Sequence, residues 1–248
     1  MKKLLSLVAL LLCLALCFTS CDILEEFGIS IDISIIEDLL FGEAQPNIPS
    51  VSLDEIPEFD GTPYVIINDN VPFFTEDEIV SESYETYYDR DGLDRCTVVI
   101  ACIGRDLMPA PGEERGSIGS VKPSGWQTIK FDIVDGKYLY NRCHLIGWQL
   151  TAENANRNNL ITGTRYMNVE GMLPFEDMVA DYIKDTENHV MYRVTPIYDG
   201  DNLVARGVLM EMYSVEDNGD GICFCVYVYN NQPGIEIDYA TGEAVLAN

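Results

Sequence analysis

The chain has 248 residues, of which 47% are hydrophobic and 23% are charged. Its 15 Lys and Arg stand against 41 Asp and Glu, which gives a formal net charge of −26 at pH 7. The apolar content excludes a disordered acidic chain and suffices for a sizeable core, in one large domain or two small ones. The net charge argues against a protein that binds a polyanion through its overall charge.

Residues 1–20 have the organisation of an export signal. Lys2 and Lys3 precede an apolar run at 4–18, and small residues follow it. That run is short for a bilayer span, which takes about 20 apolar residues, so the sequence predicts a leader rather than an anchor. Cys21 follows a segment that resembles a bacterial lipobox, which predicts attachment to the outer membrane surface through lipid on this residue. A plain secreted protein is the alternative.

Residues 21–60 carry eleven acidic side chains and neither Lys nor Arg. Pro46 and Pro49 interrupt a stretch of otherwise mixed polar residues. An acidic segment with prolines behind an export signal is typical of a spacer between an attachment point and a folded domain. We therefore expect a domain over residues 61–248.

Runs rich in β-branched and aromatic residues predict most of that domain to be strands separated by Gly, Pro and Asp turns. The predicted strands are Tyr64–Ile67, Thr97–Ile103, Gln127–Ile133, Val190–Tyr198, Leu203–Tyr213 and Ile222–Tyr229. The turns between the last three contain Asp-Gly and Asn-Gly, which favours an antiparallel run.

One amphipathic helix is predicted between these groups of strands. Apolar side chains recur with helical spacing at Phe175, Val179 and Ile183, and Pro174 suits the first turn. Strands and a helix in this order predict an α+β fold with an antiparallel β-sheet core.

Five cysteines lie beyond Cys21, at positions 96, 102, 143, 223 and 225. An odd number cannot pair completely within one chain, and none of them has the spacing of a structural zinc site. We expect buried free thiols with at most one or two disulfides.

The side chains best suited to chemistry are concentrated between positions 141 and 176, around one of only two histidines in the chain. They are, in order, Asn141-Arg142-Cys143-His144, Asn159-Leu160-Ile161-Thr162, Asn168 and Glu176. This arrangement resembles the DNA/RNA non-specific endonucleases of the ββα-metal (His-Me finger) superfamily, in their secreted bacterial form. The resemblance also takes in NDNVPF at 68–73 and RGSIGSVKPSGW at 115–126.

The resemblance implies an embedded ββα-metal motif and hydrolysis of phosphodiester bonds in DNA, with RNA as a further substrate. It makes His144 the general base, a role that suits a neutral imidazole. It places Mg²⁺, or Mn²⁺ as a substitute, on Asn168 directly and on Glu176 through water. The other implied site residues are Arg142 as a catalytic and substrate-binding phosphate clamp, Arg115 as a second clamp, Asn141 as a substrate contact, and Asn159, which orients neighbouring groups or water in catalysis.

Two positions depart from the family's Asp-Arg-Gly-His pattern. Asn141 replaces Asp, which keeps the hydrogen-bonding shape but removes a negative charge. Cys143 replaces Gly, and a side chain there is costly if the position needs a positive φ. Because His144 and Asn168 are intact, we expect an active exported enzyme. The alternatives are a catalytically impaired lipoprotein that uses the same fold to bind nucleic acid or protein, and a metal-dependent hydrolase on an unrelated α+β fold.

The distribution of charge supports a phosphate-binding site in this part of the chain. Residues 115–165 hold seven basic side chains against three acidic, a net charge of +4. The flanking segments 61–114 and 166–248 carry −9 and −12. Cations gathered around the candidate site predict local and strongly salt-sensitive binding of a polyanion, which the overall charge conceals.

Overall fold

The computed structural model describes residues 48–49 and 51–247. They belong to one compact unit that spans Asn47–Asn248. The expected leader, the expected lipid site at Cys21 and most of the expected spacer lie outside the described residues. Among the described residues, no helix is long and apolar enough to cross a membrane.

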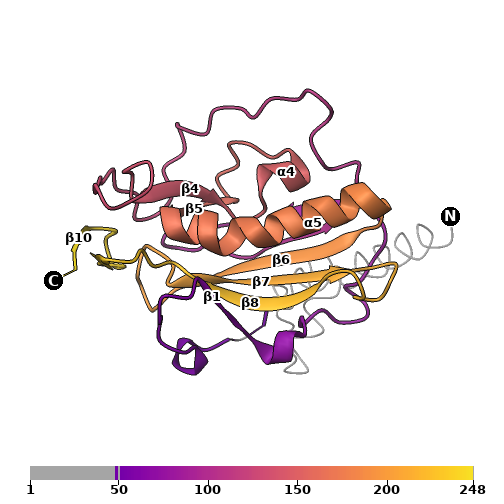
Figure 1. Cartoon of the computed structure of the whole chain (residues 1–248), viewed down its shortest axis with the longest axis horizontal. Helices are drawn as coiled ribbons and strands as arrows, with labels where there is room; N and C mark the ends of the chain where they lie inside the picture. The colour runs from indigo at the N-terminus through magenta and orange to yellow at the C-terminus, as the bar shows by residue number, and fades with distance from the viewer. Residues whose placement is uncertain (1–47, 50, 248) are drawn as a thin grey trace, which may run out of the picture. The chain divides into compact units, whose positions relative to one another are not determined.

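A six-stranded antiparallel sheet forms the centre of this unit (Figure 1). Its strands lie side by side in the order β1 (Tyr64–Ile66), β8 (Cys223–Tyr229), β7 (Gly207–Ser214), β6 (Val190–Ile197), β3 (Val99–Ile103) and β2 (Tyr84–Tyr87). The three consecutive strands β6, β7 and β8 pair as neighbours, with Met210 between Val194 and Val226. The α+β class and the antiparallel core are therefore confirmed. The sequence did not predict β2, and β7 begins at Gly207 rather than at Leu203.

The helix α5 (Leu173–Thr186) packs along one face of this sheet (Figure 1). Its inward side chains Phe175, Val179 and Ile183 are buried in one apolar cluster with residues of β3, β6, β7 and β8. Burial of each such side chain contributes about 1.5–3 kcal/mol relative to exposure. Pro174 lies in the first turn, as its position predicted. The sheet thus fixes the helix and the residues that its first turns carry.

The opposite face of the sheet holds a buried ion pair. Arg193 of β6 and Glu211 of β7 are fully buried and lie 2.7 Å apart. Glu78 adds a second carboxylate 2.9 Å from the guanidinium, and the ring of Phe74 stacks on it. Loss of one partner of a buried pair leaves an uncompensated charge, at a cost of about 3–5 kcal/mol. This network holds the segment around Phe74 and Glu78 on the face opposite α5.

A second, two-stranded sheet leads directly into the helix. β4 (Tyr140–His144) pairs antiparallel with β5 (Leu160–Thr164), and α4 (Trp148–Thr151) lies in the connection. β5 is followed by η3 (Met167–Met172), a π-helical stretch that continues into α5. These elements form the ββα unit that the resemblance implied. The remaining short elements are η1 (Leu53–Glu55), η2 (Asn68–Asn70), β9 (Ile235–Ile237) and β10 (Ala244–Leu246).

Cys143 fits into β4 because Gly163 of β5, which pairs with the nearby Asn141, has no side chain. Its backbone does not have a positive φ, so the cost expected for that conformation does not arise. A Cβ added to Gly163 of β5 would lie 2.6 Å from the Cys143 Cβ, which is closer than real contacts allow. The small residue at this contact is therefore Gly163 on β5, which leaves room for the side chain of Cys143 on β4.

The prediction of a strand over Gln127–Ile133 is wrong. In that segment only Lys130 forms a bridge, to Tyr138. The chain turns back immediately, with the Phe131 N–H donating to the Lys137 carbonyl, so no partner strand continues the pairing. The five described cysteines are all free, and four are buried, as expected.

We expect Gly163→Ala to destabilise the fold by about 1–3 kcal/mol, because its methyl group would compete with Cys143 for space. In a Cys143→Gly background the same methyl group has room and should cost much less. Urea unfolding of the two single variants and the double variant should give a coupling energy of about 0.5 kcal/mol or more. Strictly additive costs would show that the two residues do not compete.

Candidate active site

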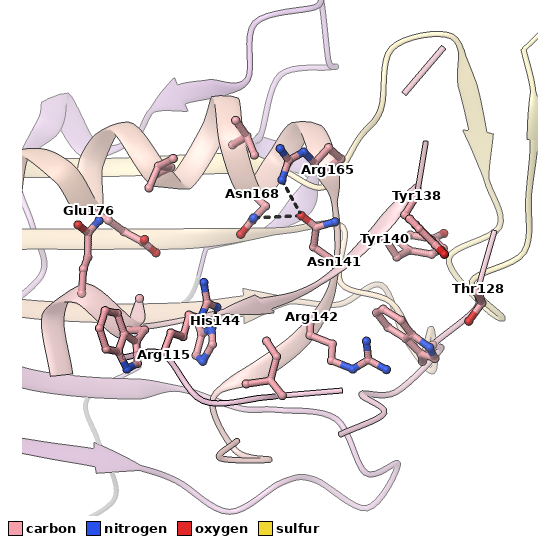
Figure 2. A pocket seen from close by; sticks show the side chains of 17 residues that line it. Arg115, Thr128, Tyr138, Tyr140, Asn141, Arg142, His144, Arg165, Asn168 and Glu176 are labelled. Carbon is pink, nitrogen blue, oxygen red and sulfur yellow. Dashed lines mark hydrogen bonds between the residues drawn. The ribbon is translucent and has the colours of Figure 1, made fainter. Parts of the chain in front are cut away.

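A pocket of about 950 Å³ lies where β4 and the start of the helix meet the loop that contains Arg115 (Figure 2). Its lining includes six of the seven residues singled out from the sequence. These are Arg115, Asn141, Arg142, His144, Asn168 and Glu176. The fold thus brings together side chains that are up to 61 positions apart in the chain (from 115 to 176).

His144 lies at the end of β4, with 5% of its surface exposed. Its Nε2 is 2.8 Å from the backbone oxygen of Asn154, and a carbonyl can only accept, so Nε2 carries the hydrogen and Nδ1 the lone pair. A guanidinium nitrogen of Arg115 donates to Nδ1 at 3.0 Å. Burial, and then the charge of Arg115, lower the pKa of His144 to about 4. The imidazole is therefore neutral near pH 7, and its basic nitrogen accepts a hydrogen bond from Arg115.

Asn168 lies in the π-helical stretch η3, an irregularity that is frequent at functional sites. Its Nδ2 donates to Asn141 Oδ1 at 3.1 Å, and its Oδ1 accepts from the Cys143 thiol at 3.0 Å. Burial raises the pKa of Cys143, so its thiol keeps the proton that it donates. Both residues that depart from the family pattern therefore contact the carboxamide of Asn168 and fix its orientation. Figure 2 shows the contact with Asn141.

Glu176 lies in the first turn of α5 and lines the same pocket with 9% of its surface exposed. Burial raises the pKa of its carboxyl to about 8, and Asp177 adds to the rise, whereas Arg115 opposes it. A Cβ on Gly147 would collide with this carboxylate, so the lack of a side chain at Gly147 leaves the space that the Glu176 carboxylate occupies. A cation beside this carboxyl would favour its charged form.

Arg142 is committed largely to the protein itself. Its Nε donates to the Val121 carbonyl and a terminal nitrogen to the Gly119 carbonyl at 2.9 Å. Its guanidinium also stacks on the Trp126 ring, 4.1 Å from the ring centre. These contacts hold the 119–126 loop along the pocket and leave the other N–H groups of Arg142 for a ligand.

Asn159 does not line the pocket. It is fully buried, and its amide exchanges hydrogen bonds with the backbone N–H and carbonyl of Ile146 at 2.8 and 2.9 Å. It thereby holds the chain just beyond His144. Sequence reasoning missed Asn154, which orients the histidine, and Arg165, which lines the pocket and pairs with Asp135 at 2.8 Å. The only sequence signal for Arg165 was its membership of the basic segment.

The donors in the pocket suit a hard, hydrated cation. Among the described residues, no three His, Cys, Asp or Glu side chains gather into a metal cage. The pocket instead offers the amide oxygen of Asn168 and the carboxyl of Glu176. Mg²⁺ keeps several waters and needs only one or two protein ligands, so these residues fit it.

A ββα unit with a pocket of this kind is characteristic of the ββα-metal class of nucleases. Residues 75–216 match the family described as DNA/RNA non-specific endonuclease, which is more than half of the chain. The chain therefore belongs to the DNA/RNA non-specific endonuclease family.

Similar proteins carry related names. The chain is 34% identical over 111 residues to a deoxyribonuclease of Streptococcus dysgalactiae subsp. equisimilis. The matched region covers 42% of this chain and 32% of that protein. It thus spans about a third of the length of this relative. It resembles NucA from Streptococcus agalactiae with magnesium bound, at 26% identity and a TM-score of 0.63, over 73% of this chain and 85% of that one. It also resembles Sda1 nuclease with zinc bound, at 27% identity and a TM-score of 0.61, over 75% and 97%.

We expect His144 to make the fold less stable as the pH falls from about 6.5 towards about 4. In that window the unfolded chain binds a proton that the folded chain does not, so the free energy of unfolding decreases by up to about 3 kcal/mol. Urea unfolding of the wild type and of His144→Gln across this window tests the expectation. His144→Gln should have a flatter profile, and parallel profiles for the two proteins would contradict it.

Proposed function

We propose that this chain is a metal-dependent endonuclease that hydrolyses phosphodiester bonds of DNA and RNA without sequence preference. The observation that carries the proposal is the neutral His144 in one pocket with Arg115, which donates to its Nδ1, and with two groups that suit a hydrated metal, Asn168 directly and Glu176 through water. Hydrolysis needs a base for water, positive charge beside the phosphate and help for the leaving oxygen.

In this proposal the phosphate of the substrate draws Arg115 away from His144. A phosphate oxygen is a stronger acceptor for a guanidinium than an imidazole nitrogen, because the bond is charge-assisted on both sides. The departure of Arg115 exposes Nδ1, which then takes the proton of the attacking water. The Asn154 carbonyl keeps the ring in the required tautomer and stabilises the imidazolium that forms.

Asn168 would hold Mg²⁺ directly and Glu176 through water, and the ion would supply Lewis-acid stabilisation of the phosphate and of the leaving oxygen. Cys143 and Asn141 prepare Asn168 for this role by holding its carboxamide from both ends. Arg142 and Arg165 add positive charge along the same pocket. Contacts of this kind recognise the backbone and carry little sequence information.

We further propose that the leader at 1–20 directs export and that Cys21 receives a lipid. Both rest on the sequence alone. The rival function is a lipoprotein with the same fold that binds nucleic acid or protein without cutting it. The contacts of Asn141 and Cys143 with Asn168 count against this rival, because both substituted residues support the carboxamide that would ligate the metal.

We expect purified chain lacking its leader to degrade plasmid DNA and RNA with Mg²⁺ or Mn²⁺ and to do nothing with EDTA. His144→Ala should lower the rate by about 10²–10⁴-fold, because the base is lost. His189→Ala is the matched control, since the second histidine is bonded to Glu216 outside the pocket. Intact substrates with wild-type protein across divalent ions would favour the non-catalytic rival.

We expect Cys143→Ala to weaken Mg²⁺ binding by about tenfold, because the donor that orients Asn168 Oδ1 is lost. Cys143→Ser keeps a donor in place and should restore most of the affinity. Calorimetric titration of Mg²⁺ without substrate measures the effect, and urea unfolding checks that all three proteins are folded. Equal affinities for the Ala and Ser variants would show that the thiol does not orient the amide.

A further inference from the structure

The pocket extends well beyond the residues that the proposed reaction uses. Figure 2 shows Tyr138, Tyr140 and Thr128 grouped at the end away from His144 and Glu176. Its volume of about 950 Å³ is at the upper end of the range for sites that hold a whole small molecule. A phosphodiester group at His144 would leave this end free for a neighbouring part of the substrate.

Two of the aromatic rings that line the pocket, Trp126 and Tyr138, each carry a cation on one face. Tyr138 is 47% exposed, and Lys130 Nζ lies 4.3 Å from the centre of its ring. The ring of Trp126 carries the Arg142 guanidinium in the same way. Rings flanked by cations are the arrangement with which proteins hold single-stranded nucleic acid, because bases stack on the rings and phosphates meet the cations.

One polar group at this end has no partner. Tyr140 is buried, and among the described residues nothing bonds to its hydroxyl. An unpaired buried hydroxyl costs about 1–3 kcal/mol, and Tyr140 belongs to the lining of the pocket.

We propose that Trp126, Tyr138 and Tyr140 form a subsite for an unpaired nucleobase of the nucleotide next to the scissile phosphate. The inference rests on the nuclease function proposed above and adds to it a preference for single-stranded or locally opened substrate. In a closed duplex each base is covered by its neighbours and its partner, so it cannot stack on Tyr138. Stacking accepts every base, so the subsite is compatible with cleavage that ignores sequence.

The test measures binding of short single-stranded DNA to the full chain carrying His144→Ala, by fluorescence anisotropy in Ca²⁺. The probe is compared with an abasic strand of equal length and charge. Tyr138→Ala should weaken binding of the normal strand by roughly 5- to 100-fold and leave the abasic strand nearly unchanged. Tyr138→Phe keeps the ring and should bind like the parent. Lys130→Met removes a charge and should weaken both strands equally.

Three outcomes overturn the subsite. They are equal affinity of the parent for normal and abasic strands, equal loss of both with Tyr138→Ala, and failure of Tyr138→Phe to restore binding. The nuclease proposal is tested separately by the wild-type chain on plasmid and RNA. Cleavage by the wild type with base-independent binding would reject the subsite alone, whereas no cleavage and no binding would reject both.

Discussion

The antiparallel pairing of β4 with β5 is the constraint on which the candidate site depends. It sets Asn141 opposite Gly163 and ends β4 at His144, while β5 leads at once into the helix that carries Asn168. A shift of one residue in this register would turn every side chain of β4 to the other face. The histidine, the amide and its supports would then no longer share one pocket. Packing of α5 on the large sheet holds the third part of the unit in place.

The two departures from the family pattern form one local adaptation. A cysteine in place of glycine is accommodated because Gly163 provides the space, and its thiol then bonds to Asn168. Asparagine in place of aspartate keeps an acceptor for the other end of the same amide. The replacement therefore removes the negative charge at position 141 but keeps the hydrogen bond to Asn168. Neither change removes a group that touches the reacting atoms in the proposed mechanism.

The local distribution of charge in this protein differs in sign from its net charge. The chain carries −26, yet Arg115, Arg142 and Arg165 line one pocket. Some of these cations are partly engaged already, by His144, by backbone carbonyls and by Asp135. Binding of a polyanion therefore exchanges internal hydrogen bonds for phosphate contacts, which limits affinity and makes it sensitive to salt.

Sequence alone specifies what depends on neighbours in the chain: the helical spacing that buries Val179, the antiparallel run of β6, β7 and β8, and the types of residue at His144 and Asn168. A strand over Gln127–Ile133 was predicted wrongly because pairing needs a second strand, and no local pattern reports its absence. Only the tertiary structure assigns hydrogen-bond partners, so it alone places Arg115 on the histidine and the Cys143 thiol on the amide. Partners that lie 25 or 29 positions apart meet through the folding of other elements, and this is why spacing could identify the groups but not their contacts.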